Sequence, residues 1–270
     1  MKKWGRFLAG IVILCIIYIV FLIVVDKKES TGSSPIFDIP SSTLTASVND
    51  DESKLLEGIK VTDNEDGDLS SKVFVESISG FDDNSCRTVT YGVFDSDDNL
   101  TRAIRTIQYI DYQKPTISLS KAVCYTNMHI MSDFKQFATA ESVVDGDLTS
   151  KITVESEYYE GNDEYVVFSV TDSCGTKETL TVKAEMLKTE PNIDIKLREY
   201  LIRVPVGTQI NAKDYIEKIS CTGMTEKALR NELQMTNDYN PNEKGMYEFV
   251  YRIALANGDY GLTKLVVIVE

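Results

Sequence analysis

The sequence has few of the residues that most often carry chemistry. Its 270 residues include one histidine, His129, and one tryptophan, Trp4. A metal site built from several histidines is therefore excluded, and a Ser-His-Asp triad would depend on His129, which we interpret as an ordinary strand or loop residue. There is no glycine-rich phosphate loop, nucleophile elbow or CxxC motif. No pair of carboxylates stands out for glycoside hydrolysis. We expect no enzymatic activity, no catalytic residue and no cofactor.

Basic residues are also scarce. The chain has 28 Lys and Arg against 42 Asp and Glu; three of the basic residues precede residue 7 and every acidic residue follows residue 25, so the part beyond residue 25 carries a net charge of −17. Such a surface repels nucleic acid and anionic lipid, so we expect no nucleic-acid partner. Because Trp4 lies before this part, the nearest approach to an aromatic row for stacking on sugar is Tyr158, Tyr159 and Tyr165.

The amino end contains a long apolar run. Residues 7–25 carry no charge and are long enough to cross a bilayer as a helix, so they predict a single transmembrane segment. Lys2, Lys3 and Arg6 precede the run, which places residues 1–6 in the cytoplasm and the rest outside the cell. A cleavable signal peptide is the competing interpretation, disfavoured by the length of the run and by the lack of an Ala-x-Ala site. Residues 26–43, rich in Ser, Thr, Gly and Pro, predict a flexible stalk.

Beyond the stalk, a twelve-residue segment occurs twice. Residues 66–77 read DGDLSSKVFVES and residues 145–156 read DGDLTSKITVES, with nine identical positions. The offset of 79 residues is about the length of a small β-sandwich domain. Further on, residues 88–99 and 165–176 align as a strand followed by an Asp-Ser turn. A third and divergent copy, without DGD, ends the chain.

The secondary-structure pattern is mostly β. Short runs of β-branched and aromatic residues, separated by turn residues, predict strands at 73–78, 87–94, 103–110, 116–120, 151–156, 165–170, 179–186, 200–206, 247–254 and 263–270. Pro115 and Pro191 each precede a new strand and mark module boundaries. Two segments, 213–219 and 225–235, predict short helices instead, and the second of them places Leu229 and Leu233 on one face.

The order of these signals carries a resemblance: a D-x-E-D-G-D-L turn, then K-[VI]-x-V, an x-V-x-[YF]-x-V strand, an Asp-Ser turn and a closing strand, with Pro leading the next copy. It resembles the bacterial surface immunoglobulin-like domains found in tandem on Gram-positive envelope proteins. The resemblance implies an all-β chain of immunoglobulin-like β-sandwiches after the transmembrane helix, with domains at 44–113, 114–189 and 190–270. It implies spacer or binding modules and no chemistry.

The acidic turns have two interpretations. Asp63, Glu65, Asp66 and Asp68 could offer Ca²⁺ a set of hard oxygen ligands. The second copy keeps Asp145 and Asp147, with Glu141 nearby. The other interpretation, which we favour, is turn chemistry: aspartates accept backbone N–H groups, Gly67 and Gly146 adopt positive φ, and Leu69 and Leu148 fill the core. The spacing does not match an EF-hand loop.

The cysteines do not determine a pattern. Cys86, Cys124, Cys174 and Cys221 lie outside the predicted membrane segment, where disulfides are permitted. Cys124 and Cys174 share the second copy and are the candidate pair within one domain. Four cysteines allow three pairings, and unpaired thiols are an equal alternative.

The function indicated by these features is that of a non-enzymatic, single-pass protein of the bacterial cell membrane. Its tandem domains would act outside the cell as spacers and as binding or adhesion modules for a protein or glycan. An accessory or scaffold subunit of a cell-envelope assembly and a carbohydrate-binding module are the alternatives. The third copy lacks DGD and gains the 225–235 segment. One hypothesis is that recognition resides there, with the first two copies as spacers that stay folded without it. The equal alternative is that the third copy merely diverged and its helix packs over its own open core.

Overall fold

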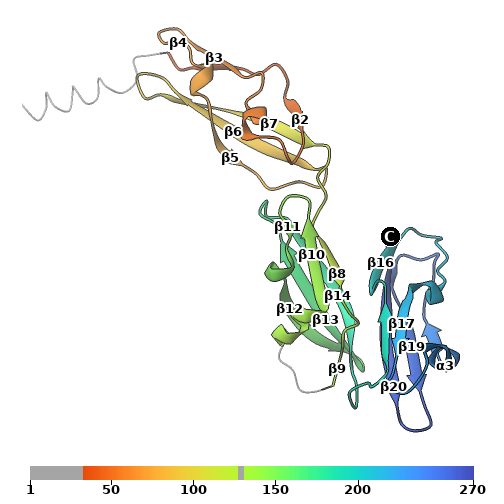
Figure 1. The fold of residues 1–270 in the computed structure, drawn as a ribbon. Coiled ribbons are helices and arrows are strands. Elements are labelled where there is room, and N and C mark those ends of the chain that lie inside the picture. Colours follow the sequence, from red (N-terminus) through yellow and green to blue (C-terminus); the bar gives the residue numbers. More distant parts are fainter. Residues whose placement is uncertain (1–32, 127–130) are drawn as a thin grey trace, which may run out of the picture. The chain divides into compact units, whose positions relative to one another are not determined.

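The computed structural model describes residues 33–126 and 131–270. They are nearly all β, in successive pairs of sheets (Figure 1), which confirms the all-β prediction for this part of the chain. The chain divides into two compact units, Met1–Asp111 and Tyr112–Glu270. The predicted transmembrane segment 7–25, its cytoplasmic flank, the first part of the stalk and His129 lie outside the described residues. Among the residues that the structure does describe, no helix is long and apolar enough to cross a bilayer.

In the first sandwich, the first two strands belong to opposite sheets. One sheet has the order β1 (Ile36–Asp38), β3 (Lys60–Asp63) and β4 (Gly67–Asp68), and the other has the order β2 (Thr43–Ala46), β7 (Leu100–Tyr109), β6 (Cys86–Phe94) and β5 (Phe74–Ile78). β1 pairs antiparallel with β3, whereas β2 pairs parallel with β7. The helical turns are α2 (Glu52–Leu55), between β2 and β3, and η1 (Ser70–Lys72), before β5.

The second sandwich repeats this topology. Its smaller sheet contains β8 (Thr116–Leu119), β10 (Ala138–Ser142) and β11 (Gly146–Asp147), and its larger sheet contains β9 (Cys124–Tyr125), β14 (Lys177–Met186), β13 (Asp163–Thr171) and β12 (Thr153–Glu160). The helical turns are η2 (Met131–Phe137) and η3 (Thr149–Lys151). The parallel pair is again the second strand with the last, β9 with β14.

The divergent third copy has the same strand plan. β15 (Asp194–Leu197) pairs antiparallel with β17 (Ile216–Ser220), and β16 (Leu201–Val204) pairs parallel with β20 (Tyr260–Val269). The larger sheet continues through β19 (Gly245–Ala254) to β18 (Gln234–Asn237). The helical segments are η4 (Ala212–Tyr215) and α3 (Glu226–Asn231). The sequence of this region resembles the other two copies only weakly, but its topology identifies it as a copy of the same module.

The core strands alternate as a half-buried sheet requires. On β6, Val89, Tyr91 and Val93 are fully buried. Between them, Thr90 is half-buried and Gly92 lies beneath the Phe74 ring. The Tyr91 hydroxyl donates to the backbone carbonyl of Leu55 in α2 at 2.7 Å. In the third sandwich, the buried Tyr251 hydroxyl donates to the carbonyl of Ala212 in η4 at the same distance. The same aromatic contact thus anchors the helical turn of both modules.

Both predicted helices are shorter than expected. The segment 213–219 forms only the last turn of η4, because Ile216–Ser220 pairs with β15 as strand β17. The segment 225–235 forms α3 over Glu226–Asn231 and then enters β18, which pairs with β19. Sheet pairing overrides local helix propensity in both places. α3 begins at the predicted position, where the Thr225 hydroxyl accepts the N–H of Ala228 at 3.3 Å.

The helix α3 occupies the place in the chain order where the first two copies have their DGD hairpins. Leu229 of α3 is completely buried, as are Leu69 and Leu148 of the hairpins, each 1% exposed. All three leucines are buried in their own sandwich. The helix therefore packs over its own sandwich, which is the ordinary role for such a segment.

Candidate functional site

The DGD segment of the first sandwich ends the tight turn between β3 and β4: residues 64–66 form the turn, and Gly67 and Asp68 are β4. Gly67 has a φ of +74°, and Leu69 is buried, as the turn interpretation predicted. The Asp63 carboxylate accepts the backbone N–H of Glu65 at 2.7 Å and that of Asp66 at 3.0 Å. These two bonds hold the pKa of Asp63 below its ordinary value. Asp63 therefore stabilises the turn by accepting its backbone N–H groups.

The other acidic residues of this turn have separate roles. The Asp66 carboxylate accepts the backbone N–H of Ser96 at 2.7 Å, and the Asp68 carboxylate accepts that of Ser70 at 2.9 Å. The side chain and the N–H of Ser70 lower the pKa of Asp68. Glu65 is exposed and contributes its backbone N–H to Asp63. The acids thus bind different backbone groups.

The second sandwich reproduces this arrangement with a different acceptor at its start. Ser142 stands where the first copy has Asp63, and its hydroxyl accepts two N–H groups of the turn. The Asp145 carboxylate accepts the N–H of Ser173 at 2.7 Å, and the Asp147 carboxylate accepts that of Thr149 at 2.8 Å. The N–H and side chain of Ser173 lower the pKa of Asp145, and the side chain and N–H of Thr149 lower the pKa of Asp147. A serine can replace Asp63 because the turn needs an acceptor rather than a charge.

A buried aspartate organises the second turn in each of the first two copies. Asp95 is 8% exposed, and one of its carboxylate oxygens accepts the N–H groups of Asp97 and Asn99 at 2.9 and 2.8 Å. Asp172 is 5% exposed and accepts the N–H groups of Cys174 and Thr176 at the same distances. Asp95 and Asp172 therefore have matching roles, although the neighbouring acids differ.

The geometry of the acidic turns does not favour the calcium interpretation. Within residues 33–126 and 131–270, no group of three or more His, Cys, Asp or Glu side chains is placed to hold a metal ion. Asp63, Asp66 and Asp68 each accept a backbone N–H, so a bound cation would compete with these hydrogen bonds. We continue to interpret the acidic turns as structural.

The candidate disulfide is not formed. The four described cysteines, Cys86, Cys124, Cys174 and Cys221, are all thiols. Cys124 pairs in register with Glu185 near the end of β14, whereas Cys174 lies in the turn before that strand begins. The length of β14 separates them by about 25 Å, at ~3.3 Å per residue, far beyond the reach of a disulfide. Sharing a repeat therefore does not bring these two cysteines together.

The second and third sandwiches share a buried contact that we call the seam. Leu201 and Val266 of the third sandwich belong to the same buried cluster as Ile117 and Val182 of the second. The Arg203 guanidinium also donates to the carbonyl of Ile117 at 3.1 Å. Removing residues 192–270 would uncover this part of the second sandwich, so we no longer expect the second copy to be unaffected by that deletion.

A buried lysine lies in the seam. The Lys264 ammonium is 2.7 Å from the Glu185 carboxylate of the second sandwich and 3.3 Å from Glu248 of its own, and the Lys264 side chain is 4% exposed. Burial opposes its charge, but Glu248 and Glu185 outweigh burial, so the pKa of Lys264 is raised. Burial raises the pKa of Glu248. The pair Lys264–Glu185 joins the two sandwiches.

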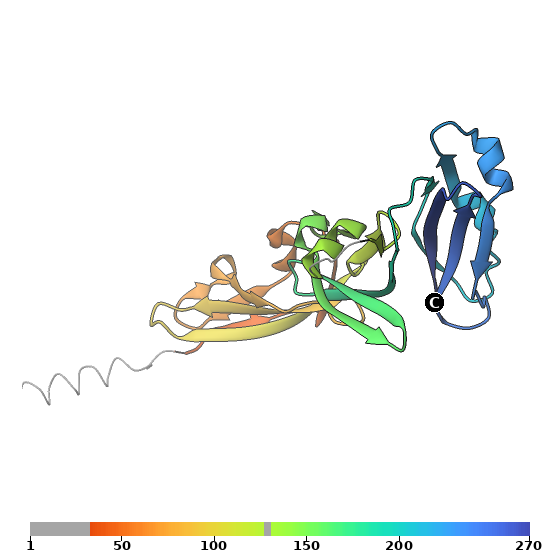
Figure 2. The same cartoon turned by 90° about the horizontal axis from the view of Figure 1, so that it is seen from below.

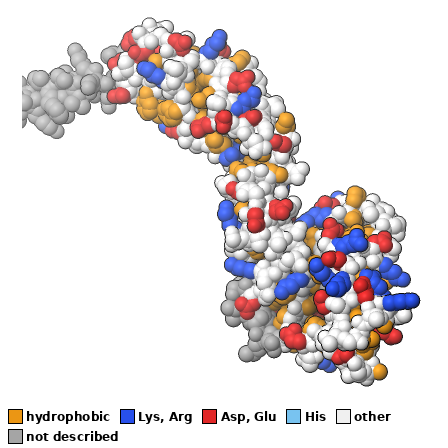
Figure 3. All heavy atoms as spheres, viewed as in Figure 1, with side chains coloured by type: hydrophobic (Ala, Val, Ile, Leu, Met, Phe, Trp, Pro, Cys, Tyr) orange, Lys and Arg blue, Asp and Glu red, His pale blue; other side chains and the backbone are white. Residues whose placement is uncertain are grey.

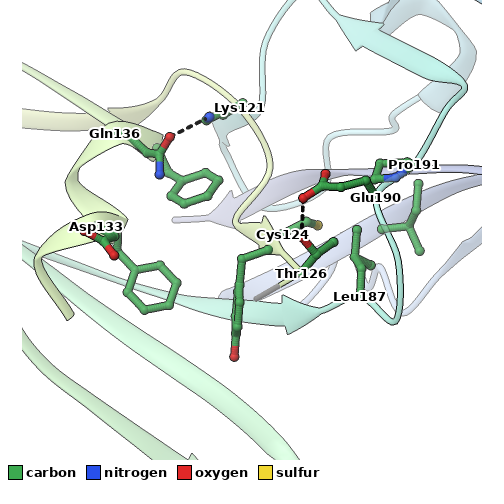
Figure 4. Close-up of a pocket in the computed structure, with 12 residues that line it drawn as sticks. Lys121, Cys124, Thr126, Asp133, Gln136, Leu187, Glu190 and Pro191 are labelled. Carbon is green, nitrogen blue, oxygen red and sulfur yellow. Dashed lines mark hydrogen bonds between the residues drawn. The ribbon is translucent and has the colours of Figure 1, made fainter. Parts of the chain in front are cut away.

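A cavity of about 370 Å³ opens beside the seam. It is lined by Lys121 of the β8–β9 loop and by residues of β9, η2, the 187–191 linker and β20, among them Cys124, Gln136 and Leu187. In Figure 4, Thr126 hydrogen-bonds to Glu190, and Lys121 donates to Gln136 at 3.0 Å. Burial raises the pKa of the Cys124 thiol to about 12, which keeps it protonated and a weak nucleophile. The described lining gives this cavity no reactive group.

The tyrosine row divides between the two faces of its strand. Tyr158 and Tyr165 are register partners on β12 and β13, and their rings stack with centroids 5.4 Å apart. Tyr159 projects to the opposite face, is 66% exposed, and lines a groove of about 410 Å³ with Asp163 and Lys183. The three tyrosines therefore do not form one flat platform, and Tyr159 is the member that meets a pocket.

Sequence reasoning missed the seam and the groove. Residues 263–267 of β20 are buried one after another, which means that both faces of the strand are covered. The run Leu265–Val266–Val267–Ile268 following a lysine was the available signal, because a strand covered on both faces reads as a continuous apolar run. The groove had no such signal, since it joins β9, the β12–β13 hairpin and β14.

The comparisons with known proteins are distant. The chain matches no protein-family model, and no curated protein matches its sequence. Among solved structures, it is similar to the M60 catalytic domain with the CBM51-1 and CBM51-2 domains of Clostridium perfringens ZmpB, at 10% identity over 87% of this chain and 31% of that chain, with a TM-score of 0.25. The CBM51-2 domain in complex with GlcNAc and the INT domains of the same protein match at 17% identity over 56% of this chain and 42% of that one, with a TM-score of 0.24.

A lipoprotein of Bacteroides thetaiotaomicron, BT2262, matches at 11% identity over 86% of this chain and 99% of that one, with a TM-score of 0.20. The chain spans less than half the length of either ZmpB structure. At these TM-scores the likenesses decide neither the family nor the function of the chain.

Proposed function

We propose that the chain is a non-enzymatic binding protein of a bacterial surface, held in the cell membrane by residues 7–25. In this proposal residues 33–111 act as a spacer, and residues 112–270 form the recognition body outside the cell. The observation that carries it is the seam: Lys264 is buried between the second and third sandwiches with Glu185 and Glu248 as partners.

The seam supports recognition because it fixes two sandwiches as one surface. A binding surface assembled from two modules loses affinity when the modules move independently, since ordering them opposes association. Leu201 and Val266 of the third sandwich pack into the buried cluster of the second, and Lys264 forms an ion pair across the seam. Both contacts limit such movement. The charges of the third sandwich are mixed: Lys196 pairs with Glu217 and Arg230 with Glu226. Figure 3 shows such mixing on the face in view, which favours a specific partner over a general polyion.

The test is affinity capture from an envelope extract with the full chain as bait. The wild type is compared with Val266→Asp, which places a charge in the seam, and with Thr90→Asp on the outer face of β6 as the matched control. We expect one envelope component to be captured by the wild type and by the control and to be lost with Val266→Asp. Equal capture by Val266→Asp would contradict the recognition body. Capture of nothing by the wild type would contradict the binding function.

The membrane anchoring has its own test. Protease added to intact protoplasts should remove everything beyond the stalk, because only residues 1–25 would be protected. A full-length protected protein would contradict the proposed orientation. A mature product that begins near residue 26 would contradict the anchor.

A further inference from the structure

The groove beside Tyr159 has the size and composition of a small-ligand site. It measures about 410 Å³ and is formed by Tyr125 of β9, the β12–β13 hairpin and the end of β14. Figure 2 shows the β12–β13 hairpin extending beyond the body of the second sandwich. Ligand pockets begin at roughly 300 Å³, so the groove can hold one sugar-sized ring.

An exposed aromatic ring forms one wall. Tyr159 is 66% exposed, although it is a large side chain on a regular strand opposite Glu164. A ring left in water on a folded sandwich is an available stacking surface, since its apolar face is not used by the core. Its neighbour Tyr158 lies on the other face and is occupied by stacking on Tyr165.

Polar groups surround this ring. Lys183 and Asp163 form an ion pair at 2.6 Å, and the Tyr125 hydroxyl donates to the Glu164 carboxylate. Asn162 adds an amide to the lining. Carboxylates accept, an ammonium donates and an amide does both, so this set matches the hydroxyl groups at the edge of a sugar. The excess of acids over Lys183 disfavours an anionic ligand.

The tyrosines of the groove have no counterpart in the first copy. The repeat offsets align Tyr158 and Tyr159 with Ser79 and Gly80 of the first copy, and align Tyr125 with Ala46. The strand register supports this alignment, because Ser79 bonds to Thr88 in the first copy as Tyr158 pairs with Tyr165 in the second. Two modules with the same plan therefore differ at the groove, which indicates a property added to the second rather than a requirement of the fold.

We propose that this groove binds a hexopyranose unit of a neutral glycan, with the Tyr159 ring against the apolar C–H face of the sugar. Asp163, Lys183 and Asn162 hydrogen-bond to its hydroxyl groups. The inference rests on the proposed binding function, for which it names a site and a ligand class.

The experiment is native affinity electrophoresis of the purified full chain in gels that contain a polysaccharide. The neutral probes are hydroxyethylcellulose, galactomannan and laminarin, and polygalacturonate is the anionic probe. We expect a neutral probe to retard the wild type, Tyr159→Ala to weaken that interaction about tenfold, and Tyr159→Phe to retain it, because stacking needs the ring and not the hydroxyl. Phe74→Ala, which removes an exposed aromatic of the first sandwich, is the matched control and should behave as the wild type.

Three results would overturn the site: no retardation by any neutral probe, equal retardation of Tyr159→Ala, or retardation by polygalacturonate alone. Melting curves of each variant show whether a loss reflects unfolding. The two proposals can fail separately. If the envelope extract yields a partner that Tyr159→Ala still captures, and no neutral glycan is bound, the glycan site is wrong while the binding function stands.

Discussion

The carboxylate of Asp145 accepts the backbone N–H of Ser173 at 2.7 Å. This bond joins the DGD turn of the second sandwich to the Asp-Ser turn between β13 and β14. Asp66 and Ser96 form the same bond at the same distance in the first sandwich. The DGD turn and the Asp-Ser turn, which are the two repeated sequence signatures, are therefore joined by the same hydrogen bond in both copies. The conformation of each turn depends on the other, so a repeat that keeps one is expected to keep both.

Substituting Asp145 should loosen this link between the turns. We expect Asp145→Ala to lower the free energy of unfolding by about 1 kcal/mol, because it removes one hydrogen bond to a partly exposed carboxylate. The corresponding fall in melting temperature is about 2–4 °C for a unit of this size. Urea denaturation and thermal melting of the full chain give these values. Asp145→Asn, which keeps an acceptor oxygen, is the control and should lose less. Equal losses in both variants would show that the charge and not the hydrogen bond stabilises the turn.

Calcium should not stabilise the chain. Asp63, Asp66 and Asp68 already accept backbone N–H groups, so a cation would have to displace those bonds. We expect the melting temperature to be the same in millimolar CaCl₂ and in EDTA, and we expect Asp66→Ala to respond to neither. A large rise in melting temperature with calcium, lost in Asp66→Ala, would establish the acidic turn as a metal site.

Local chemistry could be predicted from the sequence because turns and alternating strands are specified by nearby residues. Gly67 and Gly146 adopt positive φ, and Leu69 and Leu148 are buried, as their pattern indicated. The ends of the helices were less predictable. Met235 ends the segment 225–235 that was predicted as a helix, yet it pairs with Tyr251 across β18 and β19. Its strand partner is distant in sequence, so local periodicity could not reveal it.

The contacts between modules could not be derived from a repeat. The repeat shows what the copies share, whereas the seam depends on residues that differ among them. In the sequence, Lys264 is a polar position in the apolar strand predicted at 263–270. Only the fold places it beside Glu185. The cysteines show a related limit. Cys124 and Cys174 share one copy, yet the fold places them near opposite ends of β14.

Acid should destabilise the chain through its turn aspartates. The pKa values of Asp63, Asp68, Asp145 and Asp147 are lowered by hydrogen bonds in the folded state. A lowered folded pKa means that the stabilisation is present above the unfolded value, about 3.9, and is lost as the pH falls through the folded value. Glu248 has the opposite sign, because its pKa is raised by burial. We therefore expect the free energy of unfolding to fall between pH 4 and pH 2.

Urea denaturation at a series of pH values measures this dependence. The double variant Asp145→Asn/Asp147→Asn should have a shallower acid limb, since it removes two of the groups whose protonation destabilises the fold. An acid limb as steep as that of the wild type would contradict the assignment to these turns.

Cys124 should be unreactive in the folded chain. Burial raises its pKa to about 12, so almost no thiolate is present at pH 8. We expect a thiol reagent to modify Cys124 slowly until denaturant is added, and Cys124→Ala to remove one equivalent from the slow phase. Mass spectrometry under non-reducing conditions should find no link between Cys124 and Cys174. A rapid reaction of Cys124, or such a link, would contradict the described seam.

The seam gives the strongest stability prediction. Lys264→Ala leaves Glu248 buried without its cation, and breaking a buried ion pair in this way destabilises by roughly 3–5 kcal/mol. We expect a value near the lower end, because the Glu185 side chain is 37% exposed and can be hydrated. Lys264→Met with Glu248→Leu removes both charges and should recover most of the loss, since apolar replacement of a buried pair is often nearly neutral. Urea denaturation of the wild type, Lys264→Met, Glu248→Leu and the double variant measures the coupling between the two side chains. Small-angle scattering of the full chain reports whether the two sandwiches separate. If the double variant is no more stable than Lys264→Ala, the lysine stabilises the seam through its packing and the ion pair is incidental.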